Sequence, residues 1–293
     1  MSPTTLPAVG GAWMVTPAVA TTRFDRARTC GAAVTLVDLE DSVAPHDKDA
    51  ARELAADFFA TASPAGPLAG VRMNSLLTRE GIQDLLALAD YASRPPLVLV
   101  PKVESARDIE IAATALDRDG HAPQIWALIE TPRAIENAAS ILRAPRLAGA
   151  LFGAADYALL TGGARTWEAL LHARSVLANS AAAAGVAVVD SPYFDLDNLD
   201  GLRREAELAK ALGYVGKTAV HPSQVPVINE AFRPSEEELA HARAVVAARQ
   251  KNGASITSVD GRMIGAPFYA AAVALTQRAD LTSDRTGSEG VRP

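Results

Sequence analysis

The sequence has little of what most metal and nucleophile sites need: it contains one cysteine, Cys30, among 293 residues. A single cysteine excludes an internal disulfide and any metal site built from several thiolates. The five histidines show neither HxxxH nor HxH spacing, which argues against a zinc site. The chain also lacks the glycine patterns of dinucleotide and P-loop sites and has no GxSxG elbow. Several common classes of site are therefore excluded.

Basic runs and long apolar runs are missing as well. The net charge is −6 and the arginines are scattered, so the chain has no electrostatic footprint for nucleic acid. No segment approaches the roughly 18 uninterrupted apolar residues that a membrane helix needs. The apolar run Gly10–Ala20 is interrupted at Thr16 and Pro17 and has no basic residue before it, since the first is Arg23, so it is not a typical signal peptide. We expect a soluble, cytoplasmic protein.

Aliphatic and small residues dominate what is present: the chain is 49% hydrophobic but only 5% aromatic. Short, almost entirely apolar runs alternate with alanine-rich amphipathic stretches, as is typical of parallel strands covered by helices on both faces. This alternation predicts a (β/α)8 TIM barrel, with a doubly wound open sheet as the alternative. The predicted strands are Trp13–Val15, Val34–Leu39, Gly70–Met73, Leu97–Lys102, Ile125–Glu130, Leu147–Phe152, Val186–Asp190 and Tyr214–Lys217.

A C-terminal segment lies outside this strand count. Ser235 and Glu238 form a capping-box pattern that predicts a helix to about Gln250, and a turn and a second helix follow. We therefore assign residues 1–230 to a catalytic barrel and 231–281 to a helical extension that acts as a lid or an oligomer contact. The polar residues 282–293 are expected to be a disordered tail.

Charged residues gather where the predicted strands end. In a parallel barrel these ends face one another around one mouth, where active sites are built, so we expect the charges to meet there. The residues are Asp38, Glu40 and Asp41 after the second strand, Arg72, Lys102 with Glu104, Glu130, Asp156, Asp190 and Lys217.

Glu130 and Asp156 are the best candidates for metal ligands. Mg²⁺ prefers oxygen ligands and is commonly held by one or two carboxylates, with other positions left to water and substrate. The alternatives are a carboxylate at the N-terminus of the next helix for Glu130 and an ordinary turn residue for Asp156.

Arg72 and Lys102 are the candidate cations. An unpaired guanidinium at the end of an apolar strand is costly, so Arg72 grips a substrate carboxylate, forms a salt bridge to Glu40 or Asp41, or does both. A lysine at a barrel strand end can form a Schiff base. The nearby Glu104 instead favours an ion-paired, permanently charged Lys102.

Taken in order, these segments resemble the citrate lyase β-subunit-like branch of the HpcH/HpaI aldolase superfamily. The resemblance covers roughly residues 12–250 and is carried by LVDLEDSVAPHDKDAAR, VRMNS, VPKVES, ALIETPRAI, LFGAADYALLTG, DSPYFDLDNLDGL and GYVGKTAVHPSQVPVINEAFRPSEEE.

The resemblance implies a barrel with Mg²⁺, or alternatively Mn²⁺, held by Glu130 and Asp156. It implies that Arg72 grips the carboxylate end of the substrate, that Glu40 and Asp41 sit around the metal and its waters, and that Lys102 belongs to the catalytic set. Substrate binding is further assigned to Asp190, Ser191 and Pro192. The implied substrates are acyl-CoA thioesters, and the implied assembly is a homotrimer or hexamer.

Two positions depart from the family pattern. Many relatives carry an aspartate in a Met-Ile-Asp-x-Pro context near the C-terminus, whereas this chain has Gly265 there. Relatives usually have a Pro-Gly turn near the first strand, where this chain has Thr16-Pro17-Ala18. The first departure leaves the proton-transfer residue unassigned.

The function expected from the sequence is a Mg²⁺-dependent carbon–carbon lyase that cleaves or forms a malyl-CoA- or citramalyl-CoA-type thioester. The keto acid or glyoxylate and an acyl-CoA are the other reaction partners. The alternatives are a citryl-thioester lyase subunit or non-catalytic partner that works with a carrier protein, an acyl-CoA thioesterase, and a keto-acid aldolase.

Overall fold

The computed structural model describes residues 10–252 and 257–287, which form two compact units. The first unit ends at Phe232 and the second begins at Arg233. Among the described residues, no helix combines the length and the apolar character needed to cross a membrane.

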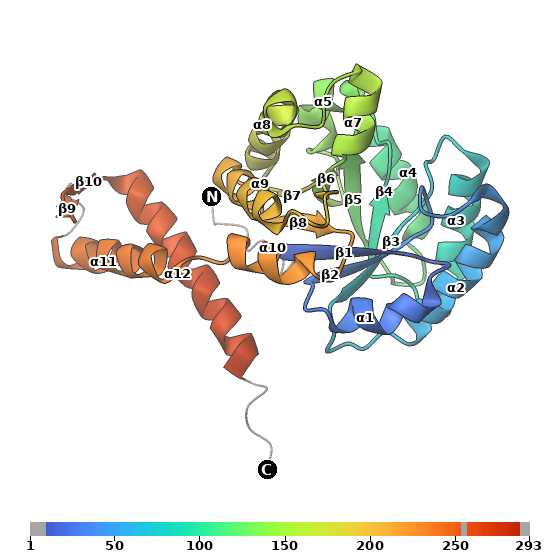
Figure 1. The fold of residues 1–293 in the computed structure, drawn as a ribbon, viewed down its shortest axis with the longest axis horizontal. Coiled ribbons are helices and arrows are strands. Elements are labelled where there is room, and N and C mark those ends of the chain that lie inside the picture. Colours follow the sequence, from blue (N-terminus) through green and yellow to red (C-terminus); the bar gives the residue numbers. More distant parts are fainter. Residues whose placement is uncertain (1–9, 253–256, 288–293) are drawn as a thin grey trace, which may run out of the picture. The chain divides into compact units, whose positions relative to one another are not determined.

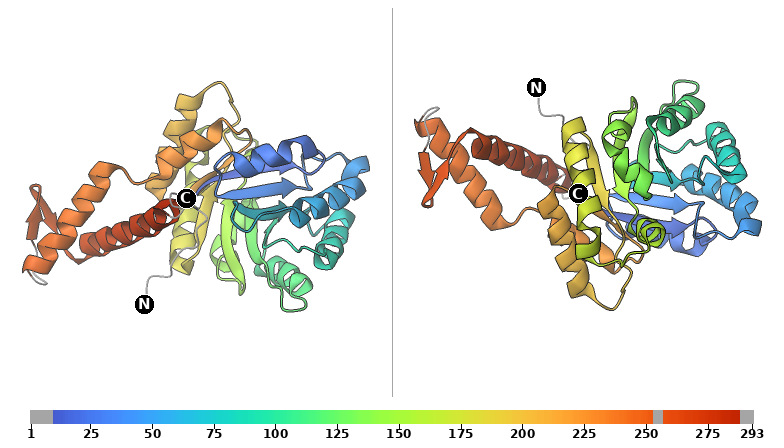
Figure 2. Two further views of the ribbon diagram at one scale, coloured as in Figure 1. Left: turned by 90° about the horizontal axis from the view of Figure 1, so that it is seen from below. Right: turned by 90° about the horizontal axis from the view of Figure 1, so that it is seen from above.

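The first unit is a closed barrel of eight parallel strands in sequence order, which confirms the predicted (β/α)8 fold (Figures 1 and 2). Strand β1 pairs with both β2 and β8 and thereby closes the barrel. The strands are β1 (Gly11–Pro17), β2 (Val34–Asp38), β3 (Leu68–Arg72), β4 (Leu97–Val100), β5 (Gln124–Ile129), β6 (Leu147–Phe152), β7 (Ala187–Asp190) and β8 (Gly216–Ala219).

Helices surround the barrel (Figure 2). Most lie where alanine-rich stretches were predicted, although α10, which follows β8, was not assigned from the sequence. They are α1 (Phe24–Thr29), α2 (Lys48–Ala60), α3 (Arg79–Asp90), α4 (Ala106–Leu116), α5 (Pro132–Glu136), α6 (Ala138–Ile141), α7 (Ala154–Thr161), α8 (Trp167–Ala184), α9 (Leu199–Leu212) and α10 (Gln224–Phe232).

The barrel interior is filled by side chains rather than left as a channel. Trp13 and Trp126 meet edge to face, with ring centroids 4.6 Å apart, inside a cluster that includes Leu36, Leu128 and Val189. Gly149 makes room for the Trp126 ring, since a Cβ at this position would lie 2.5 Å from it.

The pleat determines which strand-end residues point inward. Side chains two residues apart on a strand share a face. Leu36 and Leu128 lie in the interior, so Asp38 and Glu130 continue inward, towards the mouth. Val189 is also interior, so the adjacent Asp190 points outward, towards the helices.

The second unit contains α11 (Glu236–Asn252), a hairpin of β9 (Thr257–Val259) and β10 (Arg262–Ile264), and α12 (Ala266–Gly287). Ser235 and Glu238 form the predicted capping box, with bonds of 2.7 and 3.0 Å. The hairpin was not predicted from the sequence. Helix α12 includes residues 282–287, which the sequence analysis assigned to a disordered tail, and residues 288–293 lie outside the described part of the chain.

Candidate functional site

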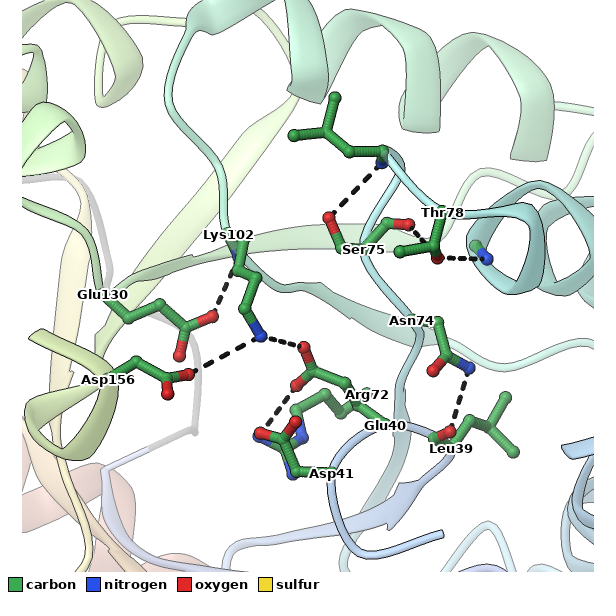
Figure 3. A network of polar contacts seen from close by, with 12 residues as sticks. Leu39, Glu40, Asp41, Arg72, Asn74, Ser75, Thr78, Lys102, Glu130 and Asp156 are labelled. Carbon is green, nitrogen blue, oxygen red and sulfur yellow. Dashed lines mark hydrogen bonds and ion pairs between the residues drawn. The ribbon is translucent and has the colours of Figure 1, made fainter. Parts of the chain in front are cut away.

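Five neighbouring strands bring charged side chains together at their carboxyl ends. Glu40 and Asp41 follow β2, Arg72 ends β3 and Lys102 follows β4. Glu130 follows β5, and Asp156 lies in the first turn of α7, after β6. Figure 3 shows these six side chains facing one another. The structure therefore brings the proposed metal ligands and the proposed catalytic residues into one cluster.

Arg72 is held on one edge by Asp38. Its Nε donates to Oδ1 and its Nη2 to Oδ2 of the fully buried Asp38 carboxylate, both over 2.7 Å. Burial alone would raise the pKa of Asp38, but the Arg72 guanidinium and hydrogen bonds from Ser42 and from the Glu40 backbone hold it below its ordinary value. No role for Asp38 was predicted from the sequence, and this bidentate pair supplies one: Asp38 holds the Arg72 guanidinium in place.

The remaining edge of Arg72 faces the mouth. Its Nη1 lies 3.0 Å from Oε2 of Glu40 and 3.5 Å from Oδ2 of Asp41. The Arg72 side chain is 18% exposed. Both structural partners expected from the sequence are thus present, and both lie on the side of Arg72 that faces the mouth.

Lys102 links three carboxylates. Its backbone N–H donates to Oε1 of Glu130 over 2.9 Å, and its ammonium donates to Oε1 of Glu40 over 2.8 Å. The ammonium also lies 3.6 Å from Oδ2 of Asp156. Lys102 has a left-handed backbone (φ 53°), which a non-glycine residue adopts only where its surroundings hold it.

The prediction that Glu104 forms an ion pair with Lys102 is wrong, because Lys102 bonds Glu40. Glu104 instead accepts a 2.8 Å bond from the Thr131 hydroxyl and lies 3.5 Å from Arg133. Burial would lower the pKa of Lys102, but its bond to Glu40 and the nearby carboxylates raise it overall. Because an ammonium is not nucleophilic, this environment disfavours Schiff-base chemistry.

Glu130 is the most buried carboxylate of the cluster, at 2% exposure. Burial, followed by the neighbouring Glu40 charge, raises its pKa well above the ordinary value, although Lys102 opposes the shift. Gly153 lies against it, since a Cβ there would be 2.6 Å from Oε2 of Glu130. One oxygen is held by Lys102, while Oε2 accepts no hydrogen bond from the described residues.

These features fit a divalent cation. Glu130 and Asp156 offer oxygen ligands, and Oε2 of Glu130 accepts no hydrogen bond from the described residues. The described residues contain no group of three or more carboxylate, histidine or cysteine side chains placed to hold a metal. Mg²⁺ is commonly held by one or two protein carboxylates and fills its other positions with water and substrate.

The raised pKa of Glu130 predicts that protein freed of divalent cations loses stability as the pH rises. A raised pKa means that the folded protein binds this proton more tightly than the unfolded chain does. The protonated Glu130 carboxyl group therefore contributes its full stabilisation below the pKa of a glutamate in the unfolded chain, about 4.3. This contribution is lost as the pH rises through the higher pKa of Glu130 in the folded protein. Glu130→Gln in EDTA should raise the melting temperature at pH 8, by about 2–4 °C for each kcal/mol of charge burial that it relieves, and by less at pH 5.

The matched control for this melting experiment is Glu104→Gln, a partly exposed carboxylate after β4. It should show no comparable gain at pH 8. A Glu130→Gln protein that melts below the wild type at pH 8 in EDTA would show that the Glu130 carboxylate stabilises the fold.

Asp190 and Lys217 do not join the cluster, and the prediction that they face the mouth is wrong. Asp190 is fully buried and accepts a 2.8 Å bond from Nε of Arg174 on α8 and a 2.6 Å bond from Lys217. Lys217 also donates to Glu205 of α9 over 2.6 Å. Strand β8 runs to Ala219, two residues beyond its predicted end, so Lys217 lies within the strand.

The other residues assigned to substrate binding lie beside this network. Ser191 is fully buried, and its hydroxyl accepts a 3.2 Å bond from Arg174. Pro192 is half-buried at the start of the loop after β7. The side chains of Asp190 and Ser191 are thus both bonded to Arg174 of α8. Neither belongs to the cluster that contains Arg72 and Lys102.

A pocket of about 340 Å³ adjoins Lys102. The loops after β3 and β4 line it, together with Arg133 of α5, whose side chain is exposed. Its apolar lining comes from Leu76, Leu77 and Pro101. The cluster therefore borders, through Lys102, a pocket large enough for a small molecule.

Gly265 lies between β10 and α12 in the second unit. A Cβ there would meet only Pro267, at 3.9 Å, so a side chain is not excluded by close neighbours. The nearby Asp260 lies 3.1 Å from Nδ1 of His241.

Sequence and structure comparisons identify relatives of this chain. A family model described as HpcH/HpaI aldolase/citrate lyase matches residues 14–222. A citrate lyase subunit beta-like protein of Mycobacterium tuberculosis is 36% identical over 290 residues, which cover 95% of this chain and 99% of that protein. A (3S)-malyl-CoA thioesterase of Cereibacter sphaeroides is 34% identical over 246 residues, or 82% of this chain and 84% of that protein.

A solved structure matches as well. CitE from Mycobacterium tuberculosis, in complex with magnesium, acetoacetate and coenzyme A, superposes with a TM-score of 0.81 at 34% identity. The match covers 93% of this chain and 99% of that one.

Proposed function

The chain belongs to the HpcH/HpaI aldolase/citrate lyase family, in its citrate lyase β-like branch, and we propose that it is a Mg²⁺-dependent carbon–carbon lyase. The proposed substrate is a 3-hydroxyacyl-CoA thioester of the malyl-CoA or citramalyl-CoA type. The observation that carries this proposal is one cluster in which Lys102 contacts Glu130 and Asp156, and Glu40 joins Lys102 to Arg72. The related CitE structure with magnesium and coenzyme A supports this assignment.

Glu130 and Asp156 would hold the magnesium ion. When bound, Mg²⁺ supplies positive charge that stabilises negative charge on substrate oxygens. Glu40 and Asp41, on the loop after β2, would order water around the ion. Lys102 contacts both proposed ligands, because it bonds Glu130 through its backbone and approaches Asp156 through its ammonium.

The Nη1 group of Arg72, which lies 3.5 Å from the exposed Asp41, would bind the substrate carboxylate in place of that contact. Asp38 fixes the opposite edge, so the guanidinium is oriented before the substrate arrives. This orientation aligns the bond that breaks, which is the main contribution that positioning makes to a cleavage reaction. Lys102, which is protonated, would donate a hydrogen bond to the substrate oxygen on which negative charge develops.

In the cleavage direction the substrate hydroxyl loses its proton and the C–C bond to the thioester's α-carbon breaks. The hydroxyl carbon becomes the carbonyl of the keto acid or glyoxylate, and the electron pair passes to the thioester enolate. A proton then reaches the enolate carbon to give the acyl-CoA, so the reaction needs no oxidant or other co-reactant.

A thioesterase is the second candidate, because a close relative carries that name. In that reaction water cleaves the C–S bond, and the products are a hydroxy acid and free coenzyme A. The two candidates therefore differ in the bond that breaks.

Product analysis separates these candidates. The purified full chain with Mg²⁺ and malyl-CoA or citramalyl-CoA should release a keto acid, trapped as its phenylhydrazone, without an equal amount of free thiol. Free thiol without keto acid would overturn the lyase in favour of the thioesterase. No turnover, combined with binding of an acyl carrier protein, would favour a partner subunit of a larger lyase. We further propose a homotrimer or hexamer, which sedimentation of the same preparation tests.

A further inference from the structure

An ammonium holds the loop that carries Glu40 and Asp41. Lys48, the first residue of α2, donates from Nζ to the carbonyl oxygens of Leu39 and Glu40, over 2.6 and 2.7 Å. Its third bond, of 2.7 Å, goes to Oδ1 of Asn74. Because an ammonium has three donors, all of them are used within this loop region.

Asn74 connects the same loop to the helix layer. Its Nδ2 donates to the Leu39 carbonyl over 2.9 Å and to Oδ2 of Asp84 over 2.8 Å, and its backbone N–H bonds the same Asp84 oxygen over 2.7 Å. Asp84 is fully buried in α3 and receives a 2.7 Å bond from Nε of Arg52 on α2. The chain of bonds thus runs from α2 and α3 to the end of β2 (Figure 3 shows Asn74 beside Leu39 and Glu40).

These contacts fix the backbone from which the Glu40 side chain projects. Lys48 draws the Leu39 and Glu40 carbonyls to one point, which sets the peptide planes on either side of Glu40. The Glu40 carboxylate then reaches Lys102 in one direction and Arg72 in the other. Without the ammonium, the Glu40 carbonyl keeps only its 3.1 Å bond from Val43 among the described residues.

We propose that Lys48 and Asn74 are positioning residues that orient Glu40 against Lys102 and Arg72, an inference that rests on the function proposed above. The hydrogen bonds of the two side chains go to each other, to the Leu39 and Glu40 carbonyls and to Asp84. They act on catalysis through the Glu40 backbone, and a displacement of that loop by about 1 Å is enough to lower a rate on the order of 100-fold.

Lys48→Met tests this role, since it keeps the aliphatic stem and removes the three donors. We expect kcat for thioester cleavage to fall about 10- to 100-fold while KM changes less than about twofold, because no contact to the substrate is removed. Amide exchange at Glu40, Ser42 and Val43, followed by mass spectrometry, should accelerate at least about tenfold.

Lys48→Ala offers a rescue that a merely structural role would not show. This variant lacks the three methylenes and the ammonium of the side chain, which n-propylammonium replaces in size and charge. Propylammonium should restore kcat several-fold in Lys48→Ala and leave Lys48→Met unchanged. Ile228→Ala, in α10 on the outer face of β1 and β8, is the control for lost stability and should alter neither kcat nor exchange in the loop.

The outcomes separate the two proposals. Exchange in residues 40–43 that matches the wild type in Lys48→Met, or a kcat within about twofold of the wild type, would overturn the positioning role. A wild-type protein that cleaves no thioester would instead sink the proposed function, and the exchange measurement would still decide whether Lys48 holds the loop.

Discussion

Asp156→Asn is expected to lower kcat for thioester cleavage on the order of 1,000-fold, because several kcal/mol of charge stabilisation are lost with the cation. The neutral amide keeps the size of the side chain but is a much weaker ligand for Mg²⁺ than a carboxylate. It also removes the charge that lies 3.6 Å from the Lys102 ammonium. Isothermal titration with Mg²⁺ should therefore show binding to the wild type and none to the variant at the same concentrations.

Asp195→Asn is the matched control for this substitution. Asp195 is also an aspartate beyond a strand end, but it is exposed in the loop after β7, and its carboxylate accepts a hydrogen bond from the Asp197 backbone. Its Mg²⁺ binding and kcat should equal those of the wild type. An Asp156→Asn protein that binds Mg²⁺ as the wild type does would remove Asp156 from the metal site. Unchanged cleavage would end the metal-dependent mechanism.

The barrel could be predicted from the sequence because each strand is a short, almost entirely apolar run. Leu97–Val100 and Leu147–Phe152 are examples whose observed bounds lie within or match the predicted ranges. Buried parallel strands leave this signal whatever their neighbours are. The β9–β10 hairpin left none, because its strands have three residues each and depend on pairing around Asp260 and Gly261.

Which charges share the mouth was only partly predictable. Asp38 and Glu130 each lie two residues after an inward-facing leucine, Leu36 or Leu128, so the pleat carries them towards the mouth. The same rule applied to Val189 places Asp190 outside, but it requires knowing which face of the strand is interior. Sequence spacing alone does not supply that information, because both faces of such a strand are apolar.

The partners of each side chain were the least predictable part. Lys102 lies two residues from Glu104 in sequence, yet it bonds Glu40, which only the closure of the barrel brings near. Lys48 bonds two backbone carbonyls, and such contacts have no residue-type signature. Asp38 pairs with Arg72 because β2 and β3 place them opposite each other in register.

Lys217→Met is expected to cost about 3–5 kcal/mol of unfolding free energy, the range found when one partner of a buried ion pair is removed. Lys217 is fully buried and contacts the carboxylates of Asp190 and Glu205, both at 2.6 Å. Without Lys217, the buried Asp190 carboxylate keeps only one of its two cationic partners among the described residues, Arg174. Urea unfolding followed by tryptophan fluorescence measures the loss in the barrel unit, since Trp13, Trp126 and Trp167 all lie there.

Two further variants decide whether the charge is responsible for that loss. Arg203→Met removes the exposed pair between Arg203 and Glu230, at 2.9 Å, and should leave the unfolding curve unchanged because water screens such pairs. The double variant Lys217→Met/Asp190→Asn should lose less than the sum of its two single variants, since the second change removes the carboxylate that the first left underpaired. If Lys217→Met unfolds at the same urea concentration as Arg203→Met, the gain from the ion pair only balances the cost of burying its charges.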